Sequence, residues 1–382
     1  MTVLTIINWF FLVILGLPAL YMFFFALCSK FFSSKCKTDG RRMRRFIILI
    51  PAYKSDSCIL STAMAAKQQC YPLNNLRILV ISDSMRADTV ERLKANGVEV
   101  LEVSFEASSK AKSLQAAMDY LGEEAADVVS IIDADNIINE DYISSLDDMF
   151  ESGATAVQAH RTAKNIDTPV AVIDAAAEEI NNSIFRKGHC TIGISSALIG
   201  SGMAFQYEWF RKRVNDFKTS GEDKEMELTL LRDGIFVNYA DHIIVLDEKT
   251  RTEDNYSKQH RRWIGSTYYI LFSALKGFGS ARMKAGYFDK LLQWAFPPRM
   301  IIMTLLPVAA ILASILQAGN VHLWWIAVIL LILSMLLGIP VTMLNFDLLK
   351  ALVKVPALAV SSIINLFRIK GTKDNFIHTE HQ

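Results

Sequence analysis

The chain has 382 residues, a net charge of +1 and a hydrophobic content of 52%. The near-neutral charge gives no global field that would attract nucleic acid, and five scattered cysteines form neither a disulfide framework nor a zinc-binding pattern. The mean hydropathy of +0.26 is high for a soluble protein, and uncharged stretches at both ends of an ordinary charged sequence account for it. The composition therefore predicts a soluble domain held between membrane segments.

Residues 3–28 form the first uncharged stretch, which is long enough to cross the roughly 30 Å of a bilayer's hydrocarbon core. A signal peptide is disfavoured because no basic segment precedes the stretch and no clear cleavage site follows it. A basic cluster comes directly afterwards, at Lys30, Lys35, Lys37, Arg41, Arg42, Arg44 and Arg45. Because positive charge accumulates on the cytoplasmic side, we expect an outside N-terminus, a membrane helix over 1–28 and a basic cytoplasmic linker over 29–45.

The next segment, residues 46–260, is expected to be the catalytic domain, in which strand-like and helix-like patterns alternate. The strands are predicted at 46–53, 76–82, 98–103 and 127–133, and the helices at 57–69, 87–95 and 109–120. This alternation predicts an α/β fold, with a mostly parallel sheet and helices on both faces. Ligands of such sheets bind at the carboxyl ends of the strands.

Polar residues stand where the predicted strands end. Tyr53 follows the first strand, Asp83 the second, and Asp133 with Asp135 the fourth. A single Asp in such a place is often only a helix cap, but agreement at several strand ends favours a ligand site. Neither a G-x-G-x-x-G nor a G-x-x-x-x-G-K-[ST] motif is present, which disfavours dinucleotide and P-loop chemistry.

Asp133 and Asp135 offer two carboxylates at the end of an apolar strand. Paired carboxylates suit a hard divalent cation, Mg²⁺ or Mn²⁺, which keeps waters and takes further oxygens from substrate phosphates. A capped turn or a surface acidic pair is the alternative interpretation of an isolated D-x-D.

A second acidic pair, Glu222 and Asp223, follows Ser220-Gly221. Two acidic residues in a first helical turn complement the helix dipole, so a capped turn explains them structurally. The functional interpretation is a general base.

A third motif places Gln259, Arg262 and Trp263 on one helical face, at i, i+3 and i+4. Arg binds phosphate as a fork and Trp offers a stacking surface. A basic collar beside anionic lipid would explain the adjacent arginines, but not the spacing of the Gln and the Trp.

The C-terminal third is again apolar. We expect interfacial helices over 261–298, two membrane spans within 299–345 and an amphipathic cytoplasmic tail over 346–382. The spans are predicted at about 300–317 and 323–344, with kinks at Pro307 and Pro340. Residues 348–367 are either a further interfacial helix or a fourth span, and their two lysines favour the interface.

Taken in order, these motifs resemble those of membrane-bound family 2 glycosyltransferases with the A-type nucleotide-sugar fold. The chain is similar to the processive hyaluronan, chitin, cellulose and poly-N-acetylglucosamine synthases. A lone D-x-D is weak, but D-x-D, then E-D, then Q-x-x-R-W, followed by paired spans, is specific. The matching residues are Pro51-Ala52-Tyr53, Asp83, Lys110 with Leu114-Gln115, Asp133-Ala134-Asp135, Gly200-Ser201-Gly202, Glu222-Asp223 and Gln259-x-x-Arg262-Trp263.

The resemblance implies a role for each of these residues. Asp223 would be the catalytic base and Asp135 the metal ligand. Residues binding the nucleotide sugar would be Pro51, Tyr53, Asp83, Lys110, Asp133, Gln259 and Arg262. Residues at the acceptor would be Gly202, Glu222 and Trp263.

The implied activity is inverting, metal-dependent transfer from a UDP-sugar to a growing polysaccharide, forming β-glycosidic bonds at the cytoplasmic face of the cell's inner or plasma membrane. Membrane lipid and export or accessory subunits are the expected partners, because three spans are few for a synthase that makes its own channel. An alternative is a single transfer to a lipid such as ceramide, diacylglycerol or polyprenyl phosphate. A non-catalytic exporter subunit is disfavoured because every carboxylate of the motifs is present.

Overall fold

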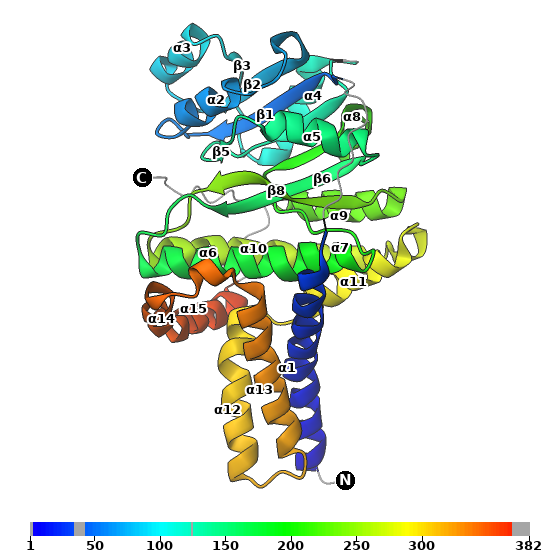
Figure 1. The fold of residues 1–382 in the computed structure, drawn as a ribbon, viewed down its shortest axis with the longest axis vertical. Helices are drawn as coiled ribbons and strands as arrows, with labels where there is room; N and C mark the ends of the chain where they lie inside the picture. The colour runs from blue at the N-terminus through cyan, green and yellow to red at the C-terminus, as the bar shows by residue number, and fades with distance from the viewer. Residues whose placement is uncertain (1–2, 34–42, 124, 369–382) are drawn as a thin grey trace.

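The computed structural model describes residues 3–33, 43–123 and 125–368 and arranges them in three levels (Figure 1). A sheet with its covering helices lies at one end, long helices cross beneath it, and an upright helical bundle forms the other end. Most of the predicted basic linker and the end of the predicted tail, residues 34–42 and 369–382, lie outside the described residues.

The sheet has eight strands in the order β3-β2-β1-β4-β7-β6-β8-β5. Its pairs β1–β2, β2–β3, β1–β4 and β6–β8 are parallel, whereas β4–β7, β6–β7 and β5–β8 are antiparallel. The predicted α/β fold is confirmed, and the four strands predicted from the sequence, β1 to β4, pair with one another in parallel. The strands are β1 Phe46–Tyr53, β2 Leu76–Asp83, β3 Glu99–Val103, β4 Val128–Ile131, β5 Ile137–Ile138, β6 Ala156–Ala163, β7 Met203–Gln206 and β8 Val237–Asp247.

Both faces of the sheet are covered, because β1 buries side chains on each. Ile48 and Ile50 pack in one apolar cluster with α2 (Ile59–Lys67) and α5 (Tyr142–Glu151). Ile47 and Leu49 pack in a second cluster with α4, α8 and α9, on the opposite face. These helices span Lys110–Leu121, Tyr207–Arg213 and Glu222–Asp233, and α3 spans Ala87–Ala95.

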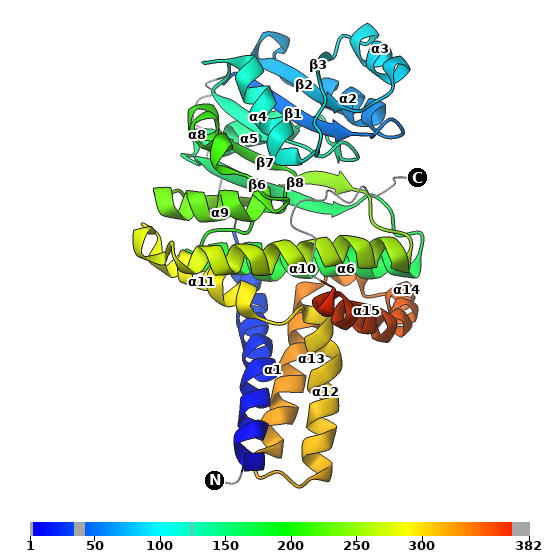
Figure 2. The ribbon, with the colours of Figure 1, turned by 180° about the vertical axis from the view of Figure 1, so that it is seen from behind.

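Two long helices lie across the middle level, roughly perpendicular to the bundle (Figures 1 and 2). They are α6 (Pro169–Asn181) and α10 (Glu253–Leu275), and α11 (Lys284–Ala295) continues beside α10. The segment predicted to hold interfacial helices, residues 261–298, therefore contains α11 and the C-terminal part of α10. The expected boundary at residue 260 falls inside this helix.

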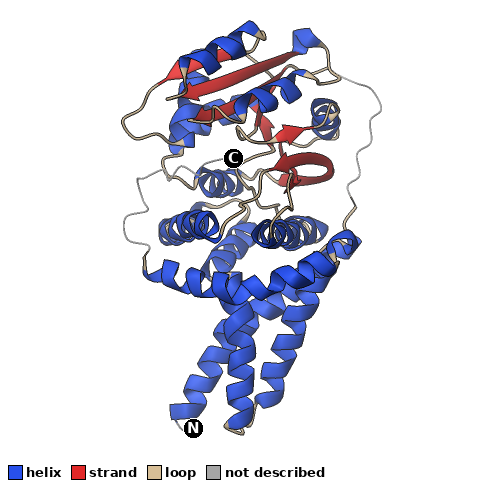
Figure 3. Cartoon of the chain, turned by 90° about the vertical axis from the view of Figure 1, so that its left-hand side faces the viewer, coloured by secondary structure: helices blue, strands red, loops and turns tan. Residues whose placement is uncertain are grey.

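The bundle, at the lower end of the molecule in Figure 3, consists of α1 (Val3–Cys28), α12 (Arg299–Ile315) and α13 (Val321–Gly338). Among the described helices, α1 and α13 are long and apolar enough to cross a membrane, and α12 joins them if it is counted with α11 as one span bent by 63°. Pro307 lies inside α12. The prediction that Pro340 kinks a span is wrong, because α13 already ends at Gly338.

The segment expected at 348–367 is divided between α14 (Phe346–Ala351) and α15 (Val355–Phe367). Each is too short to cross a bilayer as a helix. Instead, α15 lies against α10: Asn365 Nδ2 donates to the Ser257 carbonyl at 3.0 Å, and the Ser361 hydroxyl donates to Ser257 Oγ at 2.7 Å. The fourth-span alternative is therefore wrong.

The bundle and the sheet domain meet where α1 crosses a π-helical segment, Asn182–Gly188, that continues into the short α7 (His189–Thr191). A Cβ at Gly188 would lie 2.2 Å from the Phe25 carbonyl oxygen, so only glycine permits this contact between backbones. Next to it, the His189 ring stacks on Phe25 at 3.8 Å, and its Nε2 lies 3.1 Å from Asp289 Oδ2 on α11. Three elements are thus joined at one buried point.

Candidate functional site

A cavity of about 250 Å³ opens at the carboxyl ends of β1, β2 and β4, between the sheet and α10. Every predicted site residue except Gly202 lines it. The structure therefore brings together motifs that lie more than two hundred residues apart in the chain. The predicted residues in its wall are Pro51, Tyr53, Asp83, Lys110, Asp133, Asp135, Glu222, Asp223, Gln259, Arg262 and Trp263.

Tyr53 and Asp83 are register partners at the ends of two parallel strands. The residues that follow them, Lys54 and Ser84, have positive φ angles of 49° and 57°, a conformation that is uncommon outside glycine and concentrates at functional sites. Asp83 is 1% exposed; its Oδ1 accepts from the Ser84 hydroxyl at 2.9 Å, but its Oδ2 has no hydrogen-bond partner. This oxygen is ready to accept an N–H or O–H from a ligand.

The turn that carries Asp133 and Asp135 is fixed from the Gly200–Gly202 loop. Ser201 Oγ accepts from the backbone N–H of Asp133 at 2.9 Å and donates to Asn136 Oδ1. Asn136 in turn donates to Asp135 Oδ1 at 3.1 Å. Both carboxylates of the D-x-D therefore lie in one cavity wall, because β4 ends at Ile131 and leaves the chain free to turn.

Lys110 forms an ion pair with the Asp133 end of this turn. It opens α4, because Ser109 caps that helix by accepting from the Lys112 N–H at 3.3 Å. Its ammonium donates to Asp133 Oδ1 and to the Gly200 carbonyl, and lies 4.0 Å from Glu222. Burial would lower the pKa of Lys110, but the carboxylates of Asp133 and Glu222 outweigh it and raise this pKa.

Glu222 and Asp223 begin α9, as the capped-turn interpretation requires, and they also line the cavity. A Cβ at Gly221 would lie 2.8 Å from Ile270 Cδ1, so glycine lets this first turn approach α10 closely. Burial raises the pKa of Glu222 to about 7, against the opposing effect of Lys110. Glu222 therefore exchanges its proton near neutral pH.

On α10, Gln259, Arg262 and Trp263 face the cavity together, as their spacing predicted. The Gln259 Oε1 atom is buried without a hydrogen-bond partner. The helix starts at Glu253 because Thr252 caps it, accepting from the Asn255 N–H at 3.3 Å. A cation, an aromatic surface and an amide are thus presented to one ligand.

Gly202 does not line the cavity. Its N–H donates to the Ile131 carbonyl at 2.9 Å and its carbonyl accepts from Ala159 at 2.8 Å, which places it within the sheet. Gly200, which lies at the other end of the same loop, borders the cavity.

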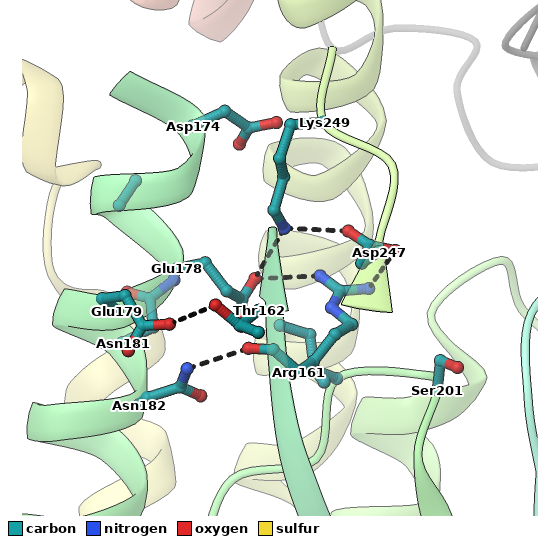
Figure 4. Close-up of polar contacts among 12 residues, drawn as sticks. Arg161, Thr162, Asp174, Glu178, Glu179, Asn181, Asn182, Ser201, Asp247 and Lys249 are labelled. Atoms are coloured by element: carbon teal, nitrogen blue, oxygen red, sulfur yellow. Dashed lines mark hydrogen bonds and ion pairs between the residues drawn. The ribbon is translucent and has the colours of Figure 1, made fainter. Parts of the chain in front are cut away.

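Sequence reasoning missed a buried ion cluster that also borders the cavity, through Arg161, Asp247 and Lys249 (Figure 4). Glu178 of α6 lies 2.9 Å from Arg161, 3.2 Å from Arg186 and 3.7 Å from Lys249, and Asp247 lies 2.8 Å from Lys249. Although burial opposes it, these cations lower the pKa of Glu178 to about 2 and also lower that of Asp247. The available signal was the placement of Asp174 and Glu178 four residues apart in an otherwise apolar helical stretch.

Asp133 and Asp135 are the protein groups that fit a divalent cation. The described residues contain no group of three or more His, Cys, Asp or Glu side chains arranged to hold a metal. Two hard oxygen donors suit Mg²⁺ or Mn²⁺ bound jointly with phosphate oxygens, and not a metal held by the protein alone. The buried amide of Asn136 already orients one of these donors.

The mixed sheet, the helices on both faces and the cavity at the strand ends define the A-type nucleotide-sugar transferase fold. The family model described as "Glycosyltransferase like family 2" matches residues 44–266. The chain therefore belongs to glycosyltransferase family 2.

Two similar proteins are each named "N-acetylglucosaminyltransferase". That of Rhizobium meliloti is 29% identical over 248 residues, and that of Rhizobium leguminosarum bv. viciae is 23% identical over 243 residues. Each match covers 60% of this chain and 57% of the relative, so the chain spans little more than half the relatives' length. The mannosyltransferase PcManGT of Pyrobaculum calidifontis, solved with GDP-Man and Mn²⁺, has a similar fold, with a TM-score of 0.62 and 16% identity over 96% of this chain and 99% of that one.

Proposed function

We propose that this protein is an inverting glycosyltransferase that moves a sugar from a UDP-sugar to a growing glycan at the cytoplasmic face of a membrane. The observation that carries the proposal is the convergence of the D-x-D, E-D and Q-x-x-R-W residues on one cavity. An isolated acidic pair would be a capped turn. Two acidic pairs facing an Arg, a Lys and a Trp form a site suited to a nucleotide diphosphate and a sugar.

In the proposed reaction, Asp223 accepts the proton of the acceptor hydroxyl while that oxygen attacks the anomeric carbon. The bond to the diphosphate breaks on the opposite face, which inverts the anomeric centre. Arg262 and Lys110 stabilise the negative charge that develops on the leaving group. A divalent cation at Asp135, beside Asp133, would add electrostatic stabilisation of the same diphosphate.

The remaining roles follow from the positions of the side chains. Asp83, through its unpartnered Oδ2, would accept an N–H of the uracil, with Tyr53 beside it and Pro51 in the adjoining wall. Gln259 and Trp263 would close over the donor and meet the acceptor, together with Glu222. Gly202 acts at most indirectly, through the loop that begins at Gly200.

N-acetylglucosamine is the first sugar to test. Both curated relatives bear the name of an N-acetylglucosaminyltransferase, although each match is partial. The mannosyltransferase of similar fold was solved with a GDP-sugar and Mn²⁺, which supports the nucleotide-sugar site and the divalent cation and makes GDP-mannose the matched competitor substrate.

The acceptor could be a polymer, as in the processive synthases, or a membrane lipid in a single transfer. The packing of the helical bundle supports a lipid acceptor as well as it supports a polymer. Buried apolar side chains from all three helices, including Leu15, Leu306 and Leu331, form one continuous cluster. A polymer made by this chain would therefore need another route across the membrane, such as an export subunit.

The test is a panel of UDP-sugars and GDP-mannose, incubated with purified protein in its native membrane lipids. UDP release and product mass are measured. A ladder of products supports polymer synthesis, and a single glycolipid supports the lipid alternative. Absence of UDP release with every UDP-sugar, while GDP-mannose is consumed, would overturn the UDP assignment.

The metal proposal has its own test. Asp135→Ala should abolish the Mn²⁺-dependent part of UDP binding, measured by calorimetry across a Mn²⁺ titration. Unchanged UDP affinity at every Mn²⁺ concentration would exclude Asp135 as the metal ligand.

A further inference from the structure

Asn136 connects the D-x-D turn to the buried ion cluster. The residue is 0% exposed. Its Nδ2 donates to Asp135 Oδ1 at 3.1 Å and to Asp247 Oδ1 at 2.9 Å, and its Oδ1 accepts from the Ser201 hydroxyl. A side-chain amide carries two N–H donors, and two carboxylates occupy both. The orientation of this amide is therefore determined by its neighbours.

Asp247 lines the cavity at the end of β8, yet its two oxygens are already engaged. Oδ2 accepts from Lys249 at 2.8 Å, and Oδ1, which accepts from Asn136, also lies 3.6 Å from the Arg161 guanidinium. A carboxylate held by two buried cations and an amide cannot turn without breaking several interactions. Asp247 is thus a fixed acceptor and a poor candidate for a metal ligand.

The cluster also attaches this acceptor to the helical level below the sheet. Arg161 bridges Asp247 to Glu178 on α6, and Lys249 approaches both carboxylates, as the contacts in Figure 4 show. Asn182 Nδ2 donates to the Arg161 carbonyl at 2.9 Å. The position of Asp247 is therefore set by β6, β8 and α6 together.

We infer that Asn136 is a positioning residue, which uses the fixed carboxylate of Asp247 to orient the carboxylate of Asp135 toward a divalent cation. The inference rests on the proposed function, because it concerns the metal that would bind with the nucleotide. Hydrogen bonds that orient a ligand typically change metal affinity about 10- to 100-fold. In this assignment neither Asn136 nor Asp247 contacts the reacting atoms.

The test compares Mn²⁺ binding by purified full-length Asn136→Ala and wild-type protein in detergent. Free Mn²⁺ is followed by electron paramagnetic resonance at fixed UDP, and transfer is assayed over the same Mn²⁺ range. We expect the Mn²⁺ concentration for half-saturation to rise about 10- to 100-fold, while kcat at saturating Mn²⁺ returns to within about threefold of wild type. A purely structural role would lower kcat or the melting temperature without this shift.

Asp247→Asn is the second variant, should Asn136→Ala fail to fold, and it should shift the midpoint in the same direction. Asp174→Asn is the matched control. Asp174 is a neighbouring buried carboxylate that accepts from the Thr250 hydroxyl at 3.2 Å, and we expect its variant to keep the wild-type Mn²⁺ midpoint.

The outcomes separate this inference from the proposed function. Wild-type protein that binds no Mn²⁺ with UDP overturns the metal part of the proposed function, and the inference with it. Wild-type binding together with unchanged midpoints in the folded variants overturns the inference alone. An equal shift in Asp174→Asn overturns it as well, because the effect would then come from loosening the whole cluster.

Discussion

The cavity has two walls that differ in how their buried carboxylates are partnered. At the ends of β1 and β2, Asp83 keeps a buried oxygen without a partner and two residues with positive φ follow the strands. At β6, β8 and α6, by contrast, Glu178, Asp247 and Lys249 are each engaged by opposite charges. The first wall retains binding capacity for a ligand, and the second holds its own groups in place.

This difference has a thermodynamic consequence. An unpartnered buried acceptor lowers the stability of the free protein and can recover that free energy when a donor binds. A paired buried charge gives little net stability, but removing its partner is costly. Substitutions in the first wall should therefore affect binding, and those in the second wall should affect folding.

The largest expected effect comes from neither wall. Asp223→Asn should lower kcat by roughly 10²- to 10⁴-fold, because the proposed general base is lost, while UDP affinity and the melting temperature stay near wild type. Transfer assays quenched at fixed times measure kcat, and calorimetry with UDP measures the affinity. Asp216→Asn, an exposed exchange of the same type, is the control. Loss of UDP binding in a folded Asp223→Asn protein would argue that this residue contacts the donor and is not the base.

The second wall is tested by Glu178→Gln. This change removes the carboxylate shared by Arg161, Arg186 and Lys249, and we expect the free energy of unfolding to fall by about 3–5 kcal/mol. Thermal unfolding in detergent measures it.

The control for this change is Glu102→Gln, which breaks a pair with Lys94 whose two side chains are 59% and 51% exposed. Such surface pairs contribute only about 0–1 kcal/mol. Equal melting temperatures for the two variants would remove the distinction between the walls.

The first wall is tested by Asp83→Asn. Replacing a charged acceptor with an amide should weaken UDP binding about 10- to 100-fold, since hydrogen bonds to charged groups contribute roughly 1.5–3 kcal/mol. The melting temperature of the free protein should not fall, because the oxygen has no partner to lose. Lower stability with intact UDP affinity would reverse the assignment of this wall.

The smallest expected effect is a pH dependence at Glu222. Its pKa is raised from 4.5 to about 7 by burial, so folding favours its protonated form. The stabilising contribution is complete below about pH 4.5 and is lost as the pH rises through 7. The melting temperature should therefore decline between pH 5 and pH 8, and Glu222→Gln should flatten that part of the profile. An unchanged slope in the variant would assign the decline to other groups.

The ends of β1 and β2 could be predicted from the sequence, because an apolar run followed by a polar residue marks each of them. The predicted strand 46–53 coincides with β1, and 76–82 differs from β2 by only one residue. Periodicity and motif spacing also placed Gln259, Arg262 and Trp263 on one face of α10. These are properties of neighbouring residues, which a single sequence displays.

The antiparallel part of the sheet and the ion cluster depend on contacts between segments that lie far apart in the chain. β7 has only four residues and inserts antiparallel between β4 and β6, which no local pattern specifies. The ion cluster joins Arg161, Glu178 and Asp247 from three separate elements, and each alone resembles an ordinary charged residue. The position of Gly202 outside the cavity was unforeseen for a related reason, because the G-S-G motif does not reveal which glycine faces inward.

The backbone contact between Gly188 and Phe25 fixes the distance between α1 and the sheet domain. With no side chain between them, α1 and the sheet domain have little room to slide or tilt against each other. If α1 crosses the membrane as proposed, the cavity is held at a constant height above the lipid, and the proposed transfer reaches only a hydroxyl that its carrier presents at that height. Under the proposed function, the length of the acceptor's carrier would then contribute to specificity, so lengthening or shortening α1 by one turn should select different acceptors without any change to the cavity.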